Sequence, residues 1–323
     1  METYILSATI QQEPNYTSTN PATQMRKDFA ACRLKFNWLG TTKSLSNNQK
    51  TQAAESFGAD GSAISAGKRL LDTKHDAYKA VTSLKSQITR FWKDNSLAYP
   101  EAGIRLIRQN RIEEFQETFD DFKAQLEAAV RRLDDHYHDL KDAARIRLGD
   151  LFDLGDYPSS LCNEFDMAWD FPSVESPDYL RQLNPELYAE QSQRVAERFD
   201  RAVEIAEQAF IEQLDQLVNH LAERLSGSED SKPKIFRDSA VQNFREFFSR
   251  FRELNVGSNE QLDELVQRCE QIISGVHPQQ LRDNESLRRS LATNLSTVQS
   301  SLDQLLVERP RRNILRRKRQ EEA

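Results

Sequence analysis

Hydrophobic residues recur at helical spacing in two long segments of the chain, 111–148 and 184–225. In both segments the apolar positions are separated alternately by three and four residues, as in a heptad repeat. Gly and Pro are absent from both interiors, so each segment is expected to form one helix of about 55–60 Å. The apolar positions are Ile112, Phe115, Phe119, Phe122, Leu126, Ala129 and Leu133 in the first segment, and Val195, Phe199, Ala202, Ala206, Phe210, Leu214, Leu217, Leu221 and Leu225 in the second.

Two long helices joined by a middle segment predict an antiparallel, coiled-coil-like helical hairpin. The middle segment, 149–183, is too rich in turn residues to continue either helix, since it contains Gly155, Pro158, Pro172 and Pro177. The whole chain has only ten Gly and ten Pro among 323 residues, which disfavours β-sandwiches, barrels and doubly wound sheets. The predicted fold class is mainly α, with the hairpin, a C-terminal helical bundle and a minor β-sheet.

Two short segments alternate apolar and polar residues as half-buried strands do, 33–39 and 165–171. Their polar faces carry opposite charges, which would face each other if the strands were neighbours. We therefore expect the two strands to pair, at the connecting end of the hairpin. In a competing arrangement 33–39 pairs with 104–107 and leaves 165–171 apart. The charged residues are Arg33 and Lys35 on one strand and Asp166 and Asp170 on the other.

Composition along the chain divides it into four parts. The segment 40–67 is predicted to be a long polar connection, followed by a helix over about 72–93. A Ser/Gly/Lys-rich stretch at 226–234 is predicted to be a linker, and three shorter helices are expected after it, at about 237–254, 260–273 and 279–308. The predicted parts are a loosely ordered N-terminal segment (1–32), a strand and helix base with the hairpin (33–225), a C-terminal helical region (235–308) and a basic tail (309–323).

Charge is distributed unevenly. The chain carries a net charge of −7, yet 309–323 holds seven basic residues against two acidic ones, a balance of +5 that leaves −12 for the rest. An acidic body repels phosphate backbones and a basic tail attracts them, so the tail is the candidate site for DNA, RNA or an acidic protein. The alternative is a solvated helix end. The tail has no aromatic residue for base stacking. Its basic residues are Arg309, Arg311, Arg312, Arg316, Arg317, Lys318 and Arg319.

Catalytic and metal-binding patterns are weak throughout. The glycines form no phosphate-binding loop. Asp135 and His138 share a helix face, but a di-metal bundle site needs a second such pair on a facing helix, and a solvated face is the alternative reading. The acids of the first long segment lie off its apolar stripe, and Cys162 has no nearby base in sequence. We assign no catalytic, cofactor or metal residue and expect a non-enzymatic protein. The acids in question are Glu113, Glu117, Asp120 and Asp121.

Cysteine usage and the N-terminus indicate a cytoplasmic protein. The three cysteines are widely separated and odd in number, which argues against a disulfide framework. The first ten residues contain no basic residue and no cleavage pattern, so they are not expected to be a signal peptide. No apolar run approaches the roughly 18 residues that span a bilayer, and no membrane association is expected.

The order of features over about residues 30–225 resembles a family of uncharacterised helical proteins from bacteria, phages and mobile elements. The matching segments are Phe36-Asn37-Trp38-Leu39-Gly40, Gly67-Lys68-Arg69-Leu70-Leu71 and Ala102-Gly103-Ile104-Arg105-Leu106, followed by the two long stripes. Members of that family are encoded beside MoxR-like AAA+ ATPases and von Willebrand A-domain proteins similar to cobaltochelatase subunits. The resemblance implies an accessory role in an ATPase-centred machine, and it supplies no catalytic residue.

The sequence thus predicts an adaptor or scaffold without enzymatic activity, with an AAA+ ATPase or A-domain protein as its partner. The alternative is a nucleic-acid-associated protein that binds phosphate through 309–323, and an enzyme of unrecognised type comes third. No cofactor is expected, and the sequence is compatible with an oligomer. These hypotheses differ in where on the chain a partner would bind.

Overall fold

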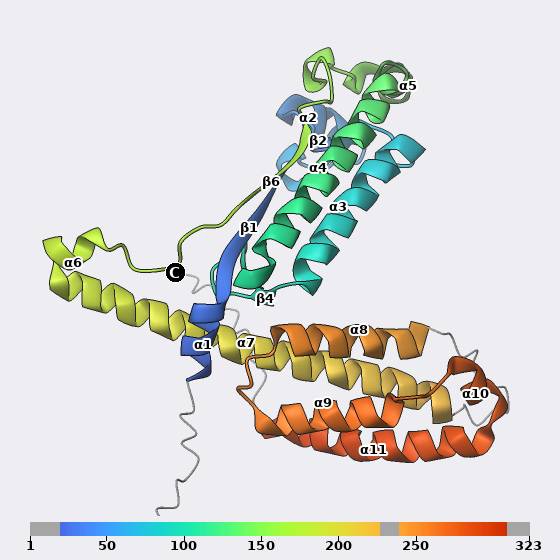
Figure 1. Ribbon diagram of the computed structural model, residues 1–323. Helices are drawn as coiled ribbons and strands as arrows, with labels where there is room; N and C mark the ends of the chain where they lie inside the picture. Colours follow the sequence, from blue (N-terminus) through green and yellow to red (C-terminus); the bar gives the residue numbers. More distant parts are fainter. Residues whose placement is uncertain (1–19, 227–238, 309–323) are drawn as a thin grey trace, which may run out of the picture.

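A four-stranded antiparallel sheet lies between two helical lobes (Figure 1). The structure is a computed structural model and describes residues 20–226 and 239–308. Alternate residues of the sheet contribute to two separate hydrophobic cores, Ala31 to one and Cys32 to the other. The strands, in spatial order, are β4 (Leu97–Ala98), β5 (Ile104–Arg108), β1 (Phe29–Trp38) and β6 (Phe165–Asp170).

The ten-residue strand β1 pairs with two partners. Its second half, from Arg33 to Trp38, pairs with β6, which confirms the pairing predicted from charge. The guanidinium of Arg33 donates two hydrogen bonds to Asp170, at 2.9 and 2.7 Å, and Lys35 lies 3.7 Å from the same carboxylate. The first half of β1 pairs with β5. The competing arrangement, in which 33–39 pairs with 104–107 and 165–171 lies apart, is therefore wrong: β5 pairs with residues 29–33, because the strand begins at Phe29, four residues before the predicted start.

The first lobe covers one face of the sheet with α3 (Asp76–Asp94), α4 (Ile112–Asp135) and α5 (Tyr137–Leu148). Helices α3 and α4 pack against each other, and α4 also contacts β6. Aromatic rings fill the space between them, including Phe91, Phe115, Phe119, Phe122 and Trp169.

The predicted single helix over 111–148 is broken at His136. Two neighbours of the break bond to the loop that follows α5. The Asp134 carboxylate accepts a hydrogen bond from the Leu161 amide at 2.6 Å, and the Tyr137 hydroxyl donates to the Pro158 carbonyl at 3.0 Å. These long-range bonds favour the break although neither Gly nor Pro is present.

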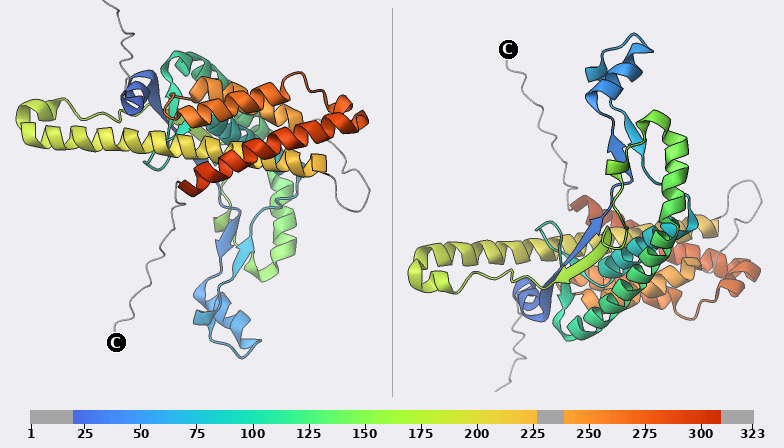
Figure 2. Two further views of the ribbon diagram at one scale, coloured as in Figure 1. Left: turned by 90° about the horizontal axis from the view of Figure 1, so that it is seen from below. Right: turned by 90° about the horizontal axis from the view of Figure 1, so that it is seen from above.

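The second lobe is built around the 42-residue helix α7 (Pro185–Ser226), whose bounds match the prediction closely. Helices α1 and α8 to α11 complete it, and Figure 2 shows α11 alongside α7. Their bounds are α1 (Pro21–Asp28), α8 (Ser239–Leu254), α9 (Glu260–Ile273), α10 (Pro278–Asp283) and α11 (Glu285–Glu308).

The predicted hairpin between 111–148 and 184–225 is wrong. Helix α4 packs on α3 and β6, whereas α7 packs on α1, α8, α9 and α11, and the apolar stripes of the two helices belong to different cores. A heptad stripe shows that a helix is covered along its length, but it does not identify the covering element.

Two segments predicted to be irregular are ordered. Within the predicted loose segment 1–32, residues 21–28 form α1, which Asn20 caps by accepting a hydrogen bond from the Ala22 amide at 2.9 Å. Met25 anchors α1 because its side chain is fully buried. The polar connection 40–67 contains further short elements, which are β2 (Thr42–Ser44), α2 (Asn47–Glu55) and the start of β3 (Gly67–Arg69).

The remaining helix predictions are confirmed in outline. Helix α3 begins at Asp76, four residues after the predicted start, and α9 has Asn259 as its N-cap, which accepts from the Leu262 amide at 3.0 Å. The predicted helix over 279–308 is two helices, since the Asn284 side chain caps α11 by accepting from the Leu287 amide at 2.9 Å. A short helix, α6 (Tyr179–Leu183), precedes α7. Within 20–226 and 239–308, none of the helices has the length and apolar character needed to cross a membrane.

Candidate functional site

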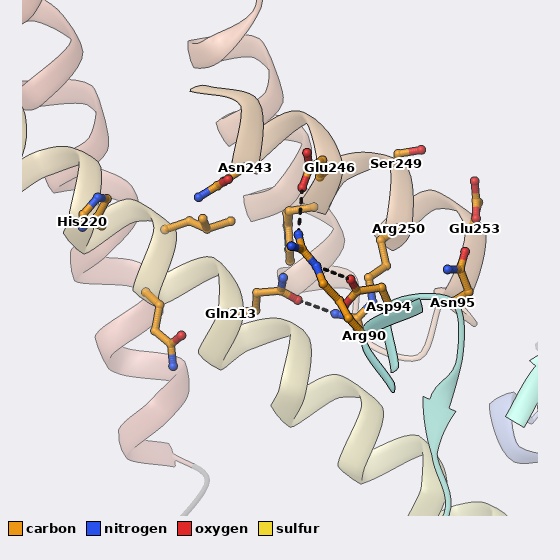
Figure 3. Close-up of a pocket in the computed structure, with 13 residues that line it drawn as sticks. Arg90, Asp94, Asn95, Gln213, His220, Asn243, Glu246, Ser249, Arg250 and Glu253 are labelled. Carbon is orange, nitrogen blue, oxygen red and sulfur yellow. Dashed lines mark hydrogen bonds and ion pairs between the residues drawn. The ribbon is translucent and has the colours of Figure 1, made fainter. Parts of the chain in front are cut away.

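An open cleft of about 740 Å³ lies where the end of α3 meets α7 and α8 (Figure 3). Its position is fixed by Arg108 of β5, whose guanidinium donates to the Glu253 carbonyl at 2.8 Å and to the Asn255 carbonyl at 2.9 Å. These carbonyls lie at the C-terminal end of α8, where backbone oxygens lack helical partners. Arg108 thereby joins the sheet to the C-terminal end of α8, which forms one wall of the cleft.

The acidic residues of the cleft wall each have an arginine partner. Arg90 lies 3.2 Å from Asp94 and 3.9 Å from Glu246, so it bridges α3 and α8 across the cleft (Figure 3). Glu253 pairs with Arg111. These contacts neutralise much of the negative charge of the wall.

One arginine of the wall, Arg250, has no acidic partner. One of its terminal nitrogens donates to the Gln213 Oε1 at 2.7 Å, and its buried Nε has no hydrogen-bond partner. Burial lowers the pKa of Arg250, and the charge of Asp94 offsets part of this effect. Arg105 lies behind it, bonded to the Ser96 hydroxyl at 2.7 Å. Burial, and then the charge of Arg250, lower the pKa of Arg105 to about 10. Within the described ranges neither arginine has a carboxylate within 4 Å.

Large exposed hydrophobic side chains are found at two projecting ends. Helices α2 and α5 lie at the far end of the first lobe, and α6 with the start of α7 projects from the second lobe (Figure 1). In the part of the chain that the structure describes, every large hydrophobic residue that is exposed belongs to one of these ends. We call Phe57, Ile146 and Leu154 the first tip, and Tyr179, Leu183 and Leu187 the second tip.

A buried ion pair supports the first tip. The Asp156 carboxylate, whose side chain is 1% exposed, lies 2.5 Å from the Nζ of Lys68, which is 6% exposed. Lys43 binds the other oxygen, and Lys68 also donates to the Leu151 carbonyl at 2.7 Å. Burial alone would raise the pKa of Asp156, but the hydrogen bonds from Lys43 and Lys68 outweigh it and hold the pKa below its usual range. The small ribbon β2–β3 is thus fastened to the loop after α5.

The sequence-predicted chemical candidates do not converge. The four acids of α4 are exposed along that helix. His138 pairs with Asp142 at 3.2 Å, and the His136 ring lies 5.1 Å from that of His75. Over the described ranges no three His, Cys, Asp or Glu residues are grouped as metal ligands. The seven basic tail residues lie outside the described residues.

The three cysteines are free and differ in accessibility. Cys162 is exposed, with its Sγ 3.6 Å from the Asp134 carboxylate. Burial raises the pKa of the Cys32 thiol to about 11 and that of Cys269 to about 12. Thiols with such pKa values contribute almost no thiolate at neutral pH.

This difference predicts the thiol reactivity of the folded protein. At pH 8 we expect one thiol per chain to react rapidly with a disulfide reagent such as DTNB, and we expect two more to react only after unfolding in guanidinium. Cys162→Ser should remove the rapid phase and leave the slow one. Rapid reaction of two thiols in the native protein would contradict the burial of Cys32 and Cys269.

Comparisons with known proteins give no match. Neither a protein-family model, nor a curated protein, nor a solved structure is similar to this chain. The resemblance of residues 30–225 to the helical family encoded beside ATPases therefore stays a prediction. In the structure, Trp38 of its first motif lies under Lys85, and Lys68 of its second motif is the buried partner of Asp156.

Sequence reasoning did not find the cleft or the two tips. The cleft combines residues of α3 with residues of α7 and α8, which lie more than a hundred positions further along the chain. The tip residues are ordinary hydrophobic residues within or beside helices, and their sequence positions do not distinguish them from core residues. The four-residue spacing of Tyr179, Leu183 and Leu187 was available in the sequence.

Proposed function

We propose that the protein is a non-enzymatic adaptor or scaffold that binds protein partners at its two tips. The observation that supports this most is the confinement of exposed large hydrophobics to the two projecting ends. Exposed apolar patches on an otherwise polar surface mark contact sites. Two such patches on separate lobes suit a protein that holds two partners, or two sites of one partner, at a fixed spacing.

The second tip is the better candidate for direct contact. Leu183 is 77% exposed, and residues 181–187 are all exposed where α6 meets α7. The resemblance to the ATPase-associated family suggests an AAA+ ATPase or an A-domain protein as the partner. The N-terminus of α7, where backbone N–H groups lack partners within the helix, would lie near the same contact.

A site-specific photo-cross-linking experiment tests this proposal. The full chain carries a benzophenone amino acid at Leu183 or at Phe57, and an AAA+ ATPase encoded next to it is supplied. We expect cross-linked products from both positions. A matched variant with the probe at Glu212, an exposed position in the middle of α7, should give none. Equal yields at Leu183, Phe57 and Glu212 would contradict binding at the tips.

A substitution provides an independent test. Leu183→Asp should abolish co-purification with the partner and leave the free energy of unfolding within about 0.5 kcal/mol, because surface changes rarely cost more. Glu186→Lys, an exposed charge change close by, serves as the control for general electrostatic effects. Loss of the complex in both variants would indicate charge dependence and would contradict an apolar contact.

A second candidate function, nucleic-acid binding, is favoured by the tail. Seven of the eleven residues from 309 to 319 are basic. We expect binding to generic duplex DNA to weaken steeply with salt, with a slope set by the number of neutralised phosphates. Removal of 309–323 should abolish this binding and shift the thermal midpoint by only a few degrees. Unchanged DNA binding after truncation would contradict a role for the tail.

A further inference from the structure

Among the described residues, the cleft between α3, α7 and α8 has one cationic group without an ion-pair partner, Arg250, on which the charge of Asp94 acts only from beyond 4 Å. The acids of the cleft are paired with Arg90 and Arg111, whereas Arg250 has only the Gln213 amide as a polar partner. Placing a cation away from water without a counter-charge is unfavourable. Such an arrangement is stable when a ligand provides the missing anion.

Two neighbours act on the Arg250 guanidinium, one by repulsion and one by orienting it. Arg105 lies behind Arg250, close enough for their charges to repel, and is itself held only by neutral groups of Ser96 and Lys93. The Phe210 ring lies 5.6 Å from the Arg250 guanidinium and fixes its position without neutralising it. The guanidinium is therefore oriented before any ligand arrives.

The remaining wall offers neutral hydrogen-bonding groups. Gln216, Asn243 and Ser249 also line the cleft, and they bring amide and hydroxyl groups to its wall; Figure 3 shows Asn243 and Ser249 on α8. A volume of about 740 Å³ is that of a small-molecule site and exceeds what a single inorganic ion fills. A ligand that fills this volume would be a polar molecule larger than a single ion, with an anionic group at one position.

We propose that this cleft binds a small molecule with a phosphate or carboxylate group, and that Arg250 receives the anionic group. An arginine fork matches the two oxygens of either group. Gln216, Asn243 and Ser249 would bind the polar body of the ligand. This site is separate from the protein contacts at the two tips, and its success or failure does not depend on them.

Calorimetric titration of the full chain with inorganic phosphate, and separately with succinate, tests the proposal at constant ionic strength. We expect saturable binding of at least one probe with one site per chain. Binding of phosphate alone would assign a phosphorylated ligand, and binding of succinate alone a carboxylic acid. Saturable binding of neither probe would overturn the proposal.

Matched variants on α8 identify the residue. Arg250→Gln should weaken binding at least about tenfold, as expected for the loss of a charge-assisted pair, and Arg245→Gln, an exposed arginine of the same helix, should leave it unchanged. Asn243→Asp adds a negative charge at an exposed position of the wall and should also weaken binding. It provides a test should Arg250→Gln fail to fold. Equal affinity in the wild type and Asn243→Asp, or equal losses in the two arginine variants, would overturn the assignment.

Discussion

Asp156→Ala is expected to lower the free energy of unfolding by about 3–5 kcal/mol, the usual cost of removing one partner from a buried ion pair. The substitution leaves the ammonium group of Lys68 buried, with only the Leu151 carbonyl to bind it. Urea denaturation followed by far-UV circular dichroism would measure the change. Ribbon β2–β3 should also lose protection from amide exchange, since the pair fastens it to the loop after α5.

Two variants separate the buried pair from general electrostatics. Lys43 binds the same carboxylate from an exposed position, so Lys43→Ala should cost far less than Asp156→Ala. The double variant with Lys68→Met and Asp156→Leu replaces the pair by apolar side chains and should recover most of the lost stability. A double variant as unstable as Asp156→Ala would show that the site needs its polarity, contrary to expectation.

Phe119→Ala is expected to destabilise the protein by about 3–5 kcal/mol, because it removes a fully buried ring from a tightly packed aromatic cluster. Phe119 lies 5.3 Å from both Phe115 and Trp169, measured between ring centroids. Phe57→Ala is the matched control. Its ring is 83% exposed, so the same change should stay within about 0.5 kcal/mol. Similar costs at the two positions would contradict the assignment of Phe119 to the core.

Combining Phe119→Ala with Leu214→Ala tests the separation of the two cores. Leu214→Ala alone should cost about 2–5 kcal/mol. Since the two residues belong to different cores, their costs should add to within about 0.5 kcal/mol. If α4 and α7 formed the predicted hairpin, Phe119 and Leu214 would share neighbours. A measured coupling energy above about 0.5 kcal/mol would therefore favour the hairpin over two separate cores.

Local structure could be predicted well from the sequence, and tertiary arrangement only in part. Helix α7 follows directly from its apolar stripe and from the absence of Gly and Pro inside the segment. The pairing of β1 with β6 was predictable because charge distinguishes partners, as Arg33 opposite Asp170 shows. Apolar stripes carry no such distinction. Two helices with similar stripes therefore suggested one hairpin, while each is covered by other elements.

The break at His136 and the order of α1 illustrate a second limit. Both depend on hydrogen bonds or burial supplied by distant residues, such as Leu161 for the Asp134 carboxylate and the core around Met25. No local pattern records these contacts. The cleft has the same origin, because an arginine without an acidic partner can be recognised only once all neighbouring side chains are placed.

Strand β1 has a consequence for the order in which the chain folds during synthesis. Arg33 is separated from Asp170 by 137 positions, so the ribosome must release the whole first lobe before the central strand can be paired on both sides. Helix α1 waits longer still, since its packing surface is on α7. Contacts between such distant positions slow folding. Until they form, the nascent N-terminal region exposes an unpaired strand and an uncovered apolar helix face, which is the stage at which a chaperone would be most useful.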